Sequence, residues 1–163
     1  MIKLLLADDH QLILDGISNL LENEQDISII DTCNNGLEVL QTLETLSNHT
    51  IDLLLLDLDM PEMNGLECAK EVMKRFPAIN IAILTMHQEK ALIQKFIEIG
   101  VKGYFVKTIQ KAELILAIKT IASGKEYFPA EVTDTLSKKQ AIIPNVTQSP
   151  LIAQLSEREI EII

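Results

Sequence analysis

The chain has 163 residues, of which 47% are hydrophobic, and its formal net charge is −10. This length suits one domain of about 100–150 residues with a smaller appendage, and the composition excludes a disordered or fibrous protein. Residues 1–122 contain 18 acidic and 10 basic residues (−8), and residues 123–163 contain 6 and 4 (−2), so neither region offers the basic surface that nucleic acid binding needs.

The first predicted element is a buried strand at residues 2–7, which is followed directly by Asp8, Asp9 and His10. The apolar run before Asp8 is too short for a signal peptide, and no stretch approaches the ~18 apolar residues of a membrane span. Cys33 and Cys68 lack metal-ligand spacing and are expected to be buried free thiols. We therefore expect a cytoplasmic protein in a reducing compartment.

Strands and helices are predicted to alternate along the rest of residues 11–124. Further strands are expected at residues 27–30, 53–56, 79–84 and 103–106, and Gly100 and Gly124 suit helix ends. The helices are indicated by apolar stripes at Ile13, Ile17, Leu20 and Leu21; at Val39, Leu40, Leu43 and Leu46; at Leu66, Ala69, Met73 and Phe76; at Leu92, Phe96 and Ile99; and at Leu114, Ile118 and Ile121. Five such units predict an α/β fold with a parallel sheet and helices on both faces.

Polar side chains follow four of the predicted strands. Because the carboxyl ends of parallel strands share one edge of a sheet, these side chains should converge there. They are Asp8 and Asp9 after the first strand, Asp57 after the third, Thr85 after the fourth and Lys107 after the fifth.

This set of groups favours phosphoryl transfer onto an aspartate. Three neighbouring carboxylates repel one another and need a cation, and hard oxygen ligands favour Mg²⁺. Lys107 could hold a phosphoryl oxygen electrostatically, and the Thr85 hydroxyl could donate to another. His10 is better explained by helix N-capping or surface exposure, and no thiol or histidine is placed for covalent chemistry instead.

The motifs resemble the receiver domain of bacterial two-component response regulators, most closely the NarL/FixJ branch. The resemblance spans residues 1 to about 122 and implies a flavodoxin-like fold with strand order 2-1-3-4-5. It rests on Asp8-Asp9-His10, Asp57-x-x-Met60-Pro61-x-Met63-Asn64-Gly65, Thr85-Met86-His87 and Gly103-Tyr104-Phe105-Val106-Lys107.

The resemblance implies that Asp57 accepts a phosphoryl group from a sensor histidine kinase. Mg²⁺ would be bound by Asp9, Asp57 and the backbone carbonyl of Asp59, whereas Asp8 would hold a metal-bound water. Such a protein is a regulator that catalyses only its own phosphorylation and dephosphorylation.

The resemblance also implies a switch. Lys107 would pair with the phosphoryl group, Thr85 would hydrogen-bond to it, and Tyr104 would turn inward. A half-buried sheet aromatic is the alternative for Tyr104. Leu14 stands where this branch often has arginine, which implies that a surface pairing on the first helix is lost.

Self-association is the expected consequence of phosphorylation. The predicted fourth helix exposes Ile93 and Ile97 beside its core stripe, and the fifth exposes Leu116. Extra apolar residues of this kind suggest a covered face, although a wide core contact explains them almost as well. We expect a phosphorylation-dependent homodimer.

The C-terminal part of the sequence changes character. Residues 123–154 are predicted to be a linker, with a short helix possible at 131–140. Residues 155–163 contain the capping box Ser156-x-x-Glu159 and resemble the opening of a LuxR-type helix-turn-helix domain. We expect a chain truncated before its DNA-binding domain, with DNA contacted only through that missing part.

Three other functions were compared with this one. The run from Leu53 to Asp59 fits the signature of a haloacid-dehalogenase-like phosphatase, but an acidic pair normally follows that signature instead of preceding it. Nucleotide binding is disfavoured because Gly100-x-x-Gly103 follows a helix and no glycine loop follows the first strand. An interaction module that acts without phosphorylation stays open.

Overall fold

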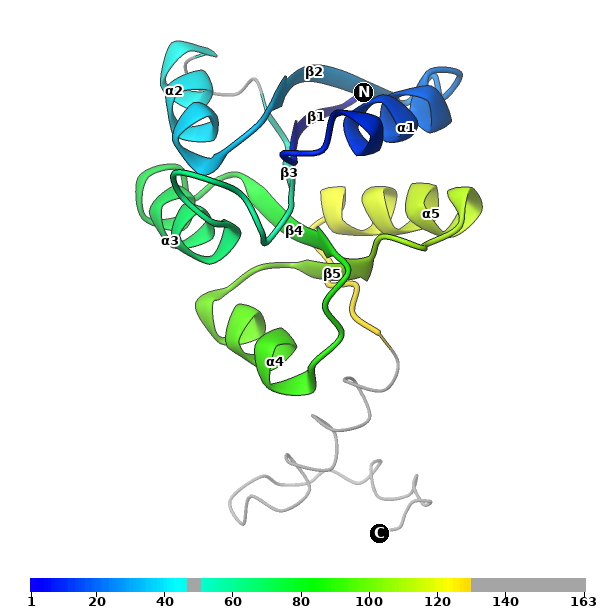
Figure 1. Cartoon of the computed structure of the whole chain (residues 1–163). Helices are drawn as coiled ribbons and strands as arrows, with labels where there is room; N and C mark the ends of the chain where they lie inside the picture. The colour runs from blue at the N-terminus through cyan, green and yellow to red at the C-terminus, as the bar shows by residue number, and fades with distance from the viewer. Residues whose placement is uncertain (47–50, 130–163) are drawn as a thin grey trace, which may run out of the picture. The chain divides into compact units, whose positions relative to one another are not determined.

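The computed structural model describes residues 1–46 and 51–129 (Figure 1). Within them, five strands form one parallel sheet in the order β2-β1-β3-β4-β5, which confirms the predicted flavodoxin-like arrangement. The elements are β1 (Ile2–Ala7), α1 (Gln11–Leu21), β2 (Ile27–Cys33), α2 (Gly36–Leu46), β3 (Leu53–Leu56), α3 (Gly65–Arg75), β4 (Asn80–Thr85), α4 (Lys90–Ile99), β5 (Gly103–Val106) and α5 (Lys111–Ala122).

Helices cover both faces of the sheet, with α1 and α5 on one side and α2, α3 and α4 on the other (Figure 1). β3 lies at the centre, and all four of its leucines are buried because alternate side chains enter the two helical layers. Leu53 and Leu55 belong to the core cluster that α1 and α5 complete. This run of leucines therefore forms the centre of the sheet and ends at Asp57.

Several side chains lie on a different helix face from the one predicted. Leu14, for which we expected only the loss of a surface pairing on α1, is buried in the core. Ile93 is 3% exposed, so it packs inward with Phe96 and does not widen an external face. On α3, Cys68 and Val72 are the buried apolar residues that the predicted stripe missed.

The start of α3 explains how the loop after β3 is held. Asn64 accepts a hydrogen bond from the Glu67 amide (2.9 Å), and the Glu67 carboxylate accepts one from the Asn64 amide (3.4 Å). The amide of Gly65 donates to the Leu58 carbonyl (2.8 Å), and a methyl group at Gly65 would overlap the Asp57 carbonyl oxygen. The loop of residues 57–64 (the β3–α3 loop) therefore folds tightly against the end of β3.

Both cysteines are buried and free, as predicted. Burial raises the pKa of Cys33 to about 11, although a hydrogen bond with Thr42 opposes the shift. Burial also raises the pKa of Cys68 to about 12. Neither thiol belongs to the group of polar side chains at the carboxyl edge of the sheet.

Residues 1–128 form one compact unit, which extends beyond the boundary expected at residue 122. Within the described residues, no helix is both long and apolar enough to cross a membrane. The short helix predicted at 131–140 and the helix-turn-helix opening predicted at 155–163 lie outside the described residues.

Candidate functional site

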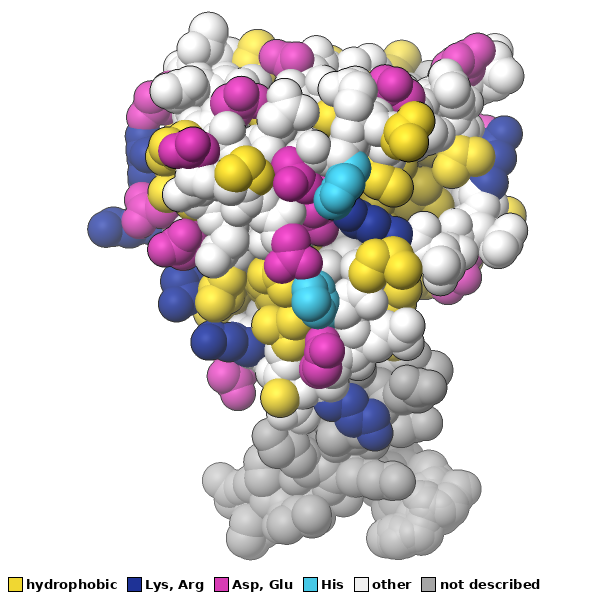
Figure 2. Space-filling model, in the orientation of Figure 1, with side chains coloured by type: hydrophobic (Ala, Val, Ile, Leu, Met, Phe, Trp, Pro, Cys, Tyr) yellow, Lys and Arg dark blue, Asp and Glu magenta, His cyan; other side chains and the backbone are white. Residues whose placement is uncertain are grey.

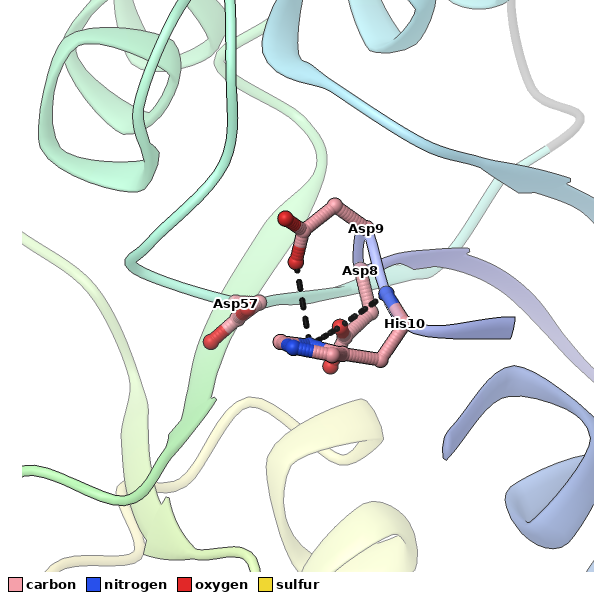
Figure 3. Close-up of side chains that lie close together, drawn as sticks. All are labelled: Asp8, Asp9, His10 and Asp57. Atoms are coloured by element: carbon pink, nitrogen blue, oxygen red, sulfur yellow. Dashed lines mark hydrogen bonds and ion pairs between the residues drawn. The ribbon is translucent and has the colours of Figure 1, made fainter. Parts of the chain in front are cut away.

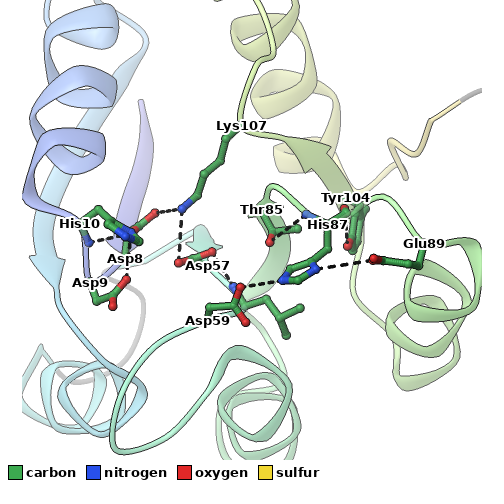
Figure 4. A network of polar contacts seen from close by, with 11 residues as sticks. Asp8, Asp9, His10, Asp57, Asp59, Thr85, His87, Glu89, Tyr104 and Lys107 are labelled. Carbon is green, nitrogen blue, oxygen red and sulfur yellow. Dashed lines mark hydrogen bonds and ion pairs between the residues drawn. The ribbon is translucent and has the colours of Figure 1, made fainter.

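The polar residues that follow the strands meet at one edge of the sheet (Figure 4). The sheet hydrogen bonds continue past the strand ends: the amide of Asp8 donates to Cys33 (3.0 Å), and that of Asp57 donates to Ala7 (2.9 Å). The amide of Lys107 likewise donates to the Thr85 carbonyl (2.9 Å). Rigid backbone pairing therefore positions these residues.

Four side chains from two strand ends form an acidic cluster (Figure 3). Asp8, Asp9, His10 and Asp57 each offer one potential ligand atom, and these atoms all lie within 4.8 Å of one another. Asp8 and Asp57 are buried, whereas Asp9 and His10 are exposed. The cluster therefore has a buried floor and a rim that is open to solvent.

Lys107 contributes the positive charge of the site. Its ammonium lies 2.7 Å from an oxygen of Asp8 and 3.3 Å from an oxygen of Asp57. Burial alone would lower the pKa of Lys107, but the two carboxylates outweigh burial and raise it. With three carboxylates against one ammonium, the formal charges leave a negative excess that a divalent cation could balance.

Asp57 has the most unusual environment of these groups. It is only 2% exposed, and burial together with the charge of Asp8 raises its pKa to about 6, despite the opposing effect of Lys107. One of its oxygens accepts a hydrogen bond from the Leu58 amide (2.8 Å). The other, Oδ2, is buried and makes no well-aligned hydrogen bond among the described residues, but it is the oxygen that lies 3.3 Å from the Lys107 ammonium. Lys107 thus compensates the buried charge of this oxygen only in part, which leaves Oδ2 able to interact with a further cation.

His10 belongs to the cluster, which the sequence reasoning did not predict. Its Nδ1 lies 3.0 Å from an oxygen of Asp8 and 3.0 Å from an oxygen of Asp9. Its backbone occupies the N-cap position of α1 without a capping hydrogen bond from the side chain, and the side chain is exposed, so the predicted surface exposure is confirmed. The available signal was its position immediately after two carboxylates at a strand end.

Thr85 and Tyr104 each form a hydrogen bond with the loop of residues 86–89 (the β4–α4 loop). Thr85 is buried, and its hydroxyl accepts a hydrogen bond from the His87 amide (3.4 Å). Tyr104 is also buried, and its hydroxyl donates to the His87 carbonyl (2.9 Å). Burial, with the charges of nearby carboxylates, raises the pKa of Tyr104. The half-buried alternative for Tyr104 is therefore wrong, and its ring points inward here.

The side chain of His87 joins two loops of the site (Figure 4). Its Nε2 lies 2.6 Å from an oxygen of Asp59, and its Nδ1 lies 3.6 Å from an oxygen of Glu89. The bond with Asp59 is the main reason that the pKa of His87 is raised. The Asp59 carboxylate is thus exposed and paired outside the acidic cluster. Sequence reasoning missed this role because it depends on a contact between residues 28 positions apart.

Comparison with known proteins agrees with this geometry. Residues 4–119 match the response regulator receiver domain family. The chain belongs to this family. Receiver domains take part in phosphorylation-based signalling and bind Mg²⁺ at an acidic pocket, and this chain has an Asp cluster at the corresponding edge of its sheet.

The relatives of this receiver are regulators of the NarL/LuxR type, as expected. The response regulator UvrY of Escherichia coli strain K12 is 33% identical over 162 residues, which cover 99% of this chain and 72% of UvrY. The crystal structure of a LuxR-family response regulator from Aurantimonas sp. SI85-9A1 is 26% identical, with a TM-score of 0.75 over 85% of this chain and 97% of that one. A structure of two RcsB dimers bound to two parallel DNAs is 25% identical, with a TM-score of 0.74 over 84% and 68% of the chains.

Proposed function

We propose that this receiver accepts a phosphoryl group on Asp57 from a sensor histidine kinase in a Mg²⁺-dependent reaction. The observation that carries the proposal is the buried Asp57 carboxylate within the acidic cluster, whose Oδ2 makes no well-aligned hydrogen bond among the described residues and lies 3.3 Å from the Lys107 ammonium. Such an oxygen is a suitable nucleophile because the Lys107 ammonium can move from it to a phosphoryl oxygen as the new bond forms.

The residues at the carboxyl edge fit a magnesium ion. Asp9, Asp57 and the backbone carbonyl of Asp59 would hold it, and Asp8 would hold a metal-bound water. All are oxygen donors, which Mg²⁺ prefers, and the uncompensated negative charge of the cluster favours a divalent cation. A bound Mg²⁺ would supply positive charge to the phosphoryl oxygens.

The transfer step uses the remaining groups. An ionised oxygen of Asp57 forms the new bond to phosphorus while the bond from phosphorus to the donor breaks, so no proton has to leave Asp57 when the pH is above its pKa of about 6. Lys107, already 3.3 Å from Asp57, then pairs with a phosphoryl oxygen. The buried Thr85 hydroxyl donates to another phosphoryl oxygen.

The output would be a change in the population of two conformations. Thr85 and Tyr104 both contact the backbone of His87, so a new partner for Thr85 alters the position of the β4–α4 loop and of Tyr104. We infer that this change favours a homodimer, and that DNA is contacted only through a further domain. The structure of RcsB dimers bound to DNA supports the dimer and the DNA contact in this proposal.

The proposal is tested by intact mass after incubation with acetyl phosphate and Mg²⁺. Wild-type protein and the surface control Asp15→Asn should each gain one phosphoryl group, labile to hydroxylamine, and Asp57→Asn should gain none. Equal labelling of Asp57→Asn would refute the assignment. Sustained turnover of p-nitrophenyl phosphate would instead favour a phosphatase, and an absence of labelling in the wild type would favour an interaction module.

A further inference from the structure

The chain that follows α5 returns to the outer edge of the sheet. The amide of Tyr127 donates to the Lys102 carbonyl (2.8 Å), and the amide of Tyr104 donates to the Tyr127 carbonyl (3.1 Å). These bonds form an isolated parallel bridge between Gly103 and Tyr127. Because β5 is an outermost strand of the sheet, residues 125–128 (the edge segment) pair with backbone groups that would otherwise be free.

Side-chain contacts fix the edge segment in this position. The Tyr127 ring packs edge-on against Phe105, with ring centroids 5.6 Å apart. Its hydroxyl donates to a carboxylate oxygen of Glu113 on α5 (2.7 Å), and this bond raises the pKa of Tyr127 to about 12. A methyl group at Gly103 would overlap the side chain of Ile121, so the glycine allows α5 to pack closely where the bridge forms.

Tyr104 connects this segment to the acidic site. Its side chain is bonded to the β4–α4 loop through the His87 carbonyl, and its backbone amide is bonded to the edge segment through the Tyr127 carbonyl. A hydrogen bond weakens steeply as its distance and angle change. A movement of Tyr104 that shifts its backbone as well as its hydroxyl therefore changes the geometry of the bridge.

We propose that the edge segment transmits the state of Tyr104 along the backbone to the chain beyond residue 128. This inference rests on the proposed function, because phosphorylation of Asp57 is what moves Tyr104. The edge segment is attached to β5 by two backbone hydrogen bonds, both of them at Tyr127, and the side chains of Tyr127 and Phe128 are only half-buried. A small shift in β5 can therefore change the fraction of molecules in which the segment is docked. The effect of phosphorylation thereby reaches the chain beyond residue 128 through the backbone, in addition to any effect on an exposed helix surface.

The sequence allows a direct test, because the chain has no tryptophan and two tyrosines, Tyr104 and Tyr127. Incorporation of 3-fluorotyrosine gives two fluorine NMR signals, which are assigned with Tyr104→Phe and Tyr127→Phe. Addition of Mg²⁺ and beryllofluoride, which mimics the phosphoryl group on Asp57, should shift both signals. It should also change the amide hydrogen exchange rate of Tyr127 by about threefold or more, because exchange reports local opening.

Variants of the edge segment provide the second measurement. Tyr127→Ala should accept a phosphoryl group on Asp57 as the wild type does, but exchange at residues 125–128 should be fast with or without beryllofluoride. Lys125→Ala, an exposed change in the same segment, should behave as the wild type. A shift of the Tyr104 signal with an unchanged Tyr127 signal and unchanged exchange would overturn the inference and leave the proposed function standing. No response at either tyrosine, together with no labelling of Asp57, would refute the proposed function and the inference that rests on it.

Discussion

The imidazole Nε2 of His87 lies 2.6 Å from a carboxylate oxygen of Asp59, and this contact joins the β4–α4 loop to the β3–α3 loop. The backbone of the same histidine donates to Thr85 and accepts from Tyr104. One residue thus links the loop that presents the Asp59 carbonyl with the two residues proposed to switch. A change in the position of either loop should therefore alter the position of the other.

Removing the His87 side chain should weaken Mg²⁺ binding without removing a ligand. In His87→Ala the backbone contacts remain, but the Asp59 segment is held less firmly, and we expect affinity to fall by roughly two- to fivefold because ligands must be oriented before they bind. Calorimetric titration measures this, with the exposed neighbour Gln88→Ala as control. Identical affinities in both variants would show that the loop is positioned by other contacts.

Loss of a cluster carboxylate should have a larger effect. Asp9→Asn and Asp8→Asn each remove one negative charge from the proposed cation site, and we expect Mg²⁺ affinity to fall by roughly tenfold or more. The same titration should give unchanged affinity for Asp15→Asn, which alters the net charge equally but lies on the surface of α1. If all three variants lose affinity to the same extent, only the overall charge matters and the site is elsewhere.

Neutralising Asp57 should stabilise the metal-free protein at neutral pH. The folded state raises the Asp57 pKa from 3.8 to about 6, so it binds this proton more tightly than the unfolded chain does. Stability therefore falls as the pH rises from about 4 to about 6, and the cost is fully present above that range. Asp57→Asn removes this cost, so its free energy of unfolding should exceed that of the wild type by on the order of 2 kcal/mol at pH 7.5.

The measurement for this prediction is urea unfolding with EDTA at pH 7.5 and at pH 4. The difference between Asp57→Asn and the wild type should shrink markedly at pH 4, where the wild-type carboxyl is protonated in the folded state. Added Mg²⁺ should stabilise the wild type more than the variant. A gain that is equal at both pH values would mean that ionisation of Asp57 is not its cause.

Thr85→Ala should separate phosphorylation from its structural consequence. The Thr85 side chain is not among the proposed metal ligands, so labelling of Asp57 and Mg²⁺ affinity should stay near wild-type values. The Tyr104 fluorine signal should no longer respond to beryllofluoride, whereas Thr85→Ser, which keeps the hydroxyl, should retain the response. Lost Mg²⁺ affinity in Thr85→Ala would contradict this division of roles.

Self-association should depend on the phosphoryl group and on α5. Leu116 is 59% exposed on this helix, and beryllofluoride should favour a dimer by about 1–3 kcal/mol in sedimentation equilibrium. Leu116→Gln should reduce this stabilisation of the dimer, whereas Leu37→Gln, at an exposed position on α2, should leave it unchanged. A protein that stays monomeric at high concentration in both states would exclude the dimer.

The sequence predicted those features that local patterns control. The leucine run of β3 and the polar residues after four of the five strands identified the sheet and the edge where Asp57 and Lys107 meet. The burial of Ile93 was not predictable, because Leu92, Ile93 and Ile97 fit adjacent helix faces equally well and tertiary packing selects one. The bonds of His10 and His87 with carboxylates were missed for a related reason: each depends on how a loop turns after its strand ends.

Because the two thiols are buried, their reaction with an alkylating reagent would report unfolding of the protein. Because the thiolate is the reactive form, pKa values of about 11 for Cys33 and about 12 for Cys68 make both unreactive towards alkylating reagents while the fold is closed. Alkylation would then report only molecules that have opened around the end of β2, where Cys33 lies, or around α3, where Cys68 lies. For the same reason, a cysteine introduced on the surface could carry a spectroscopic label without removal of the native pair.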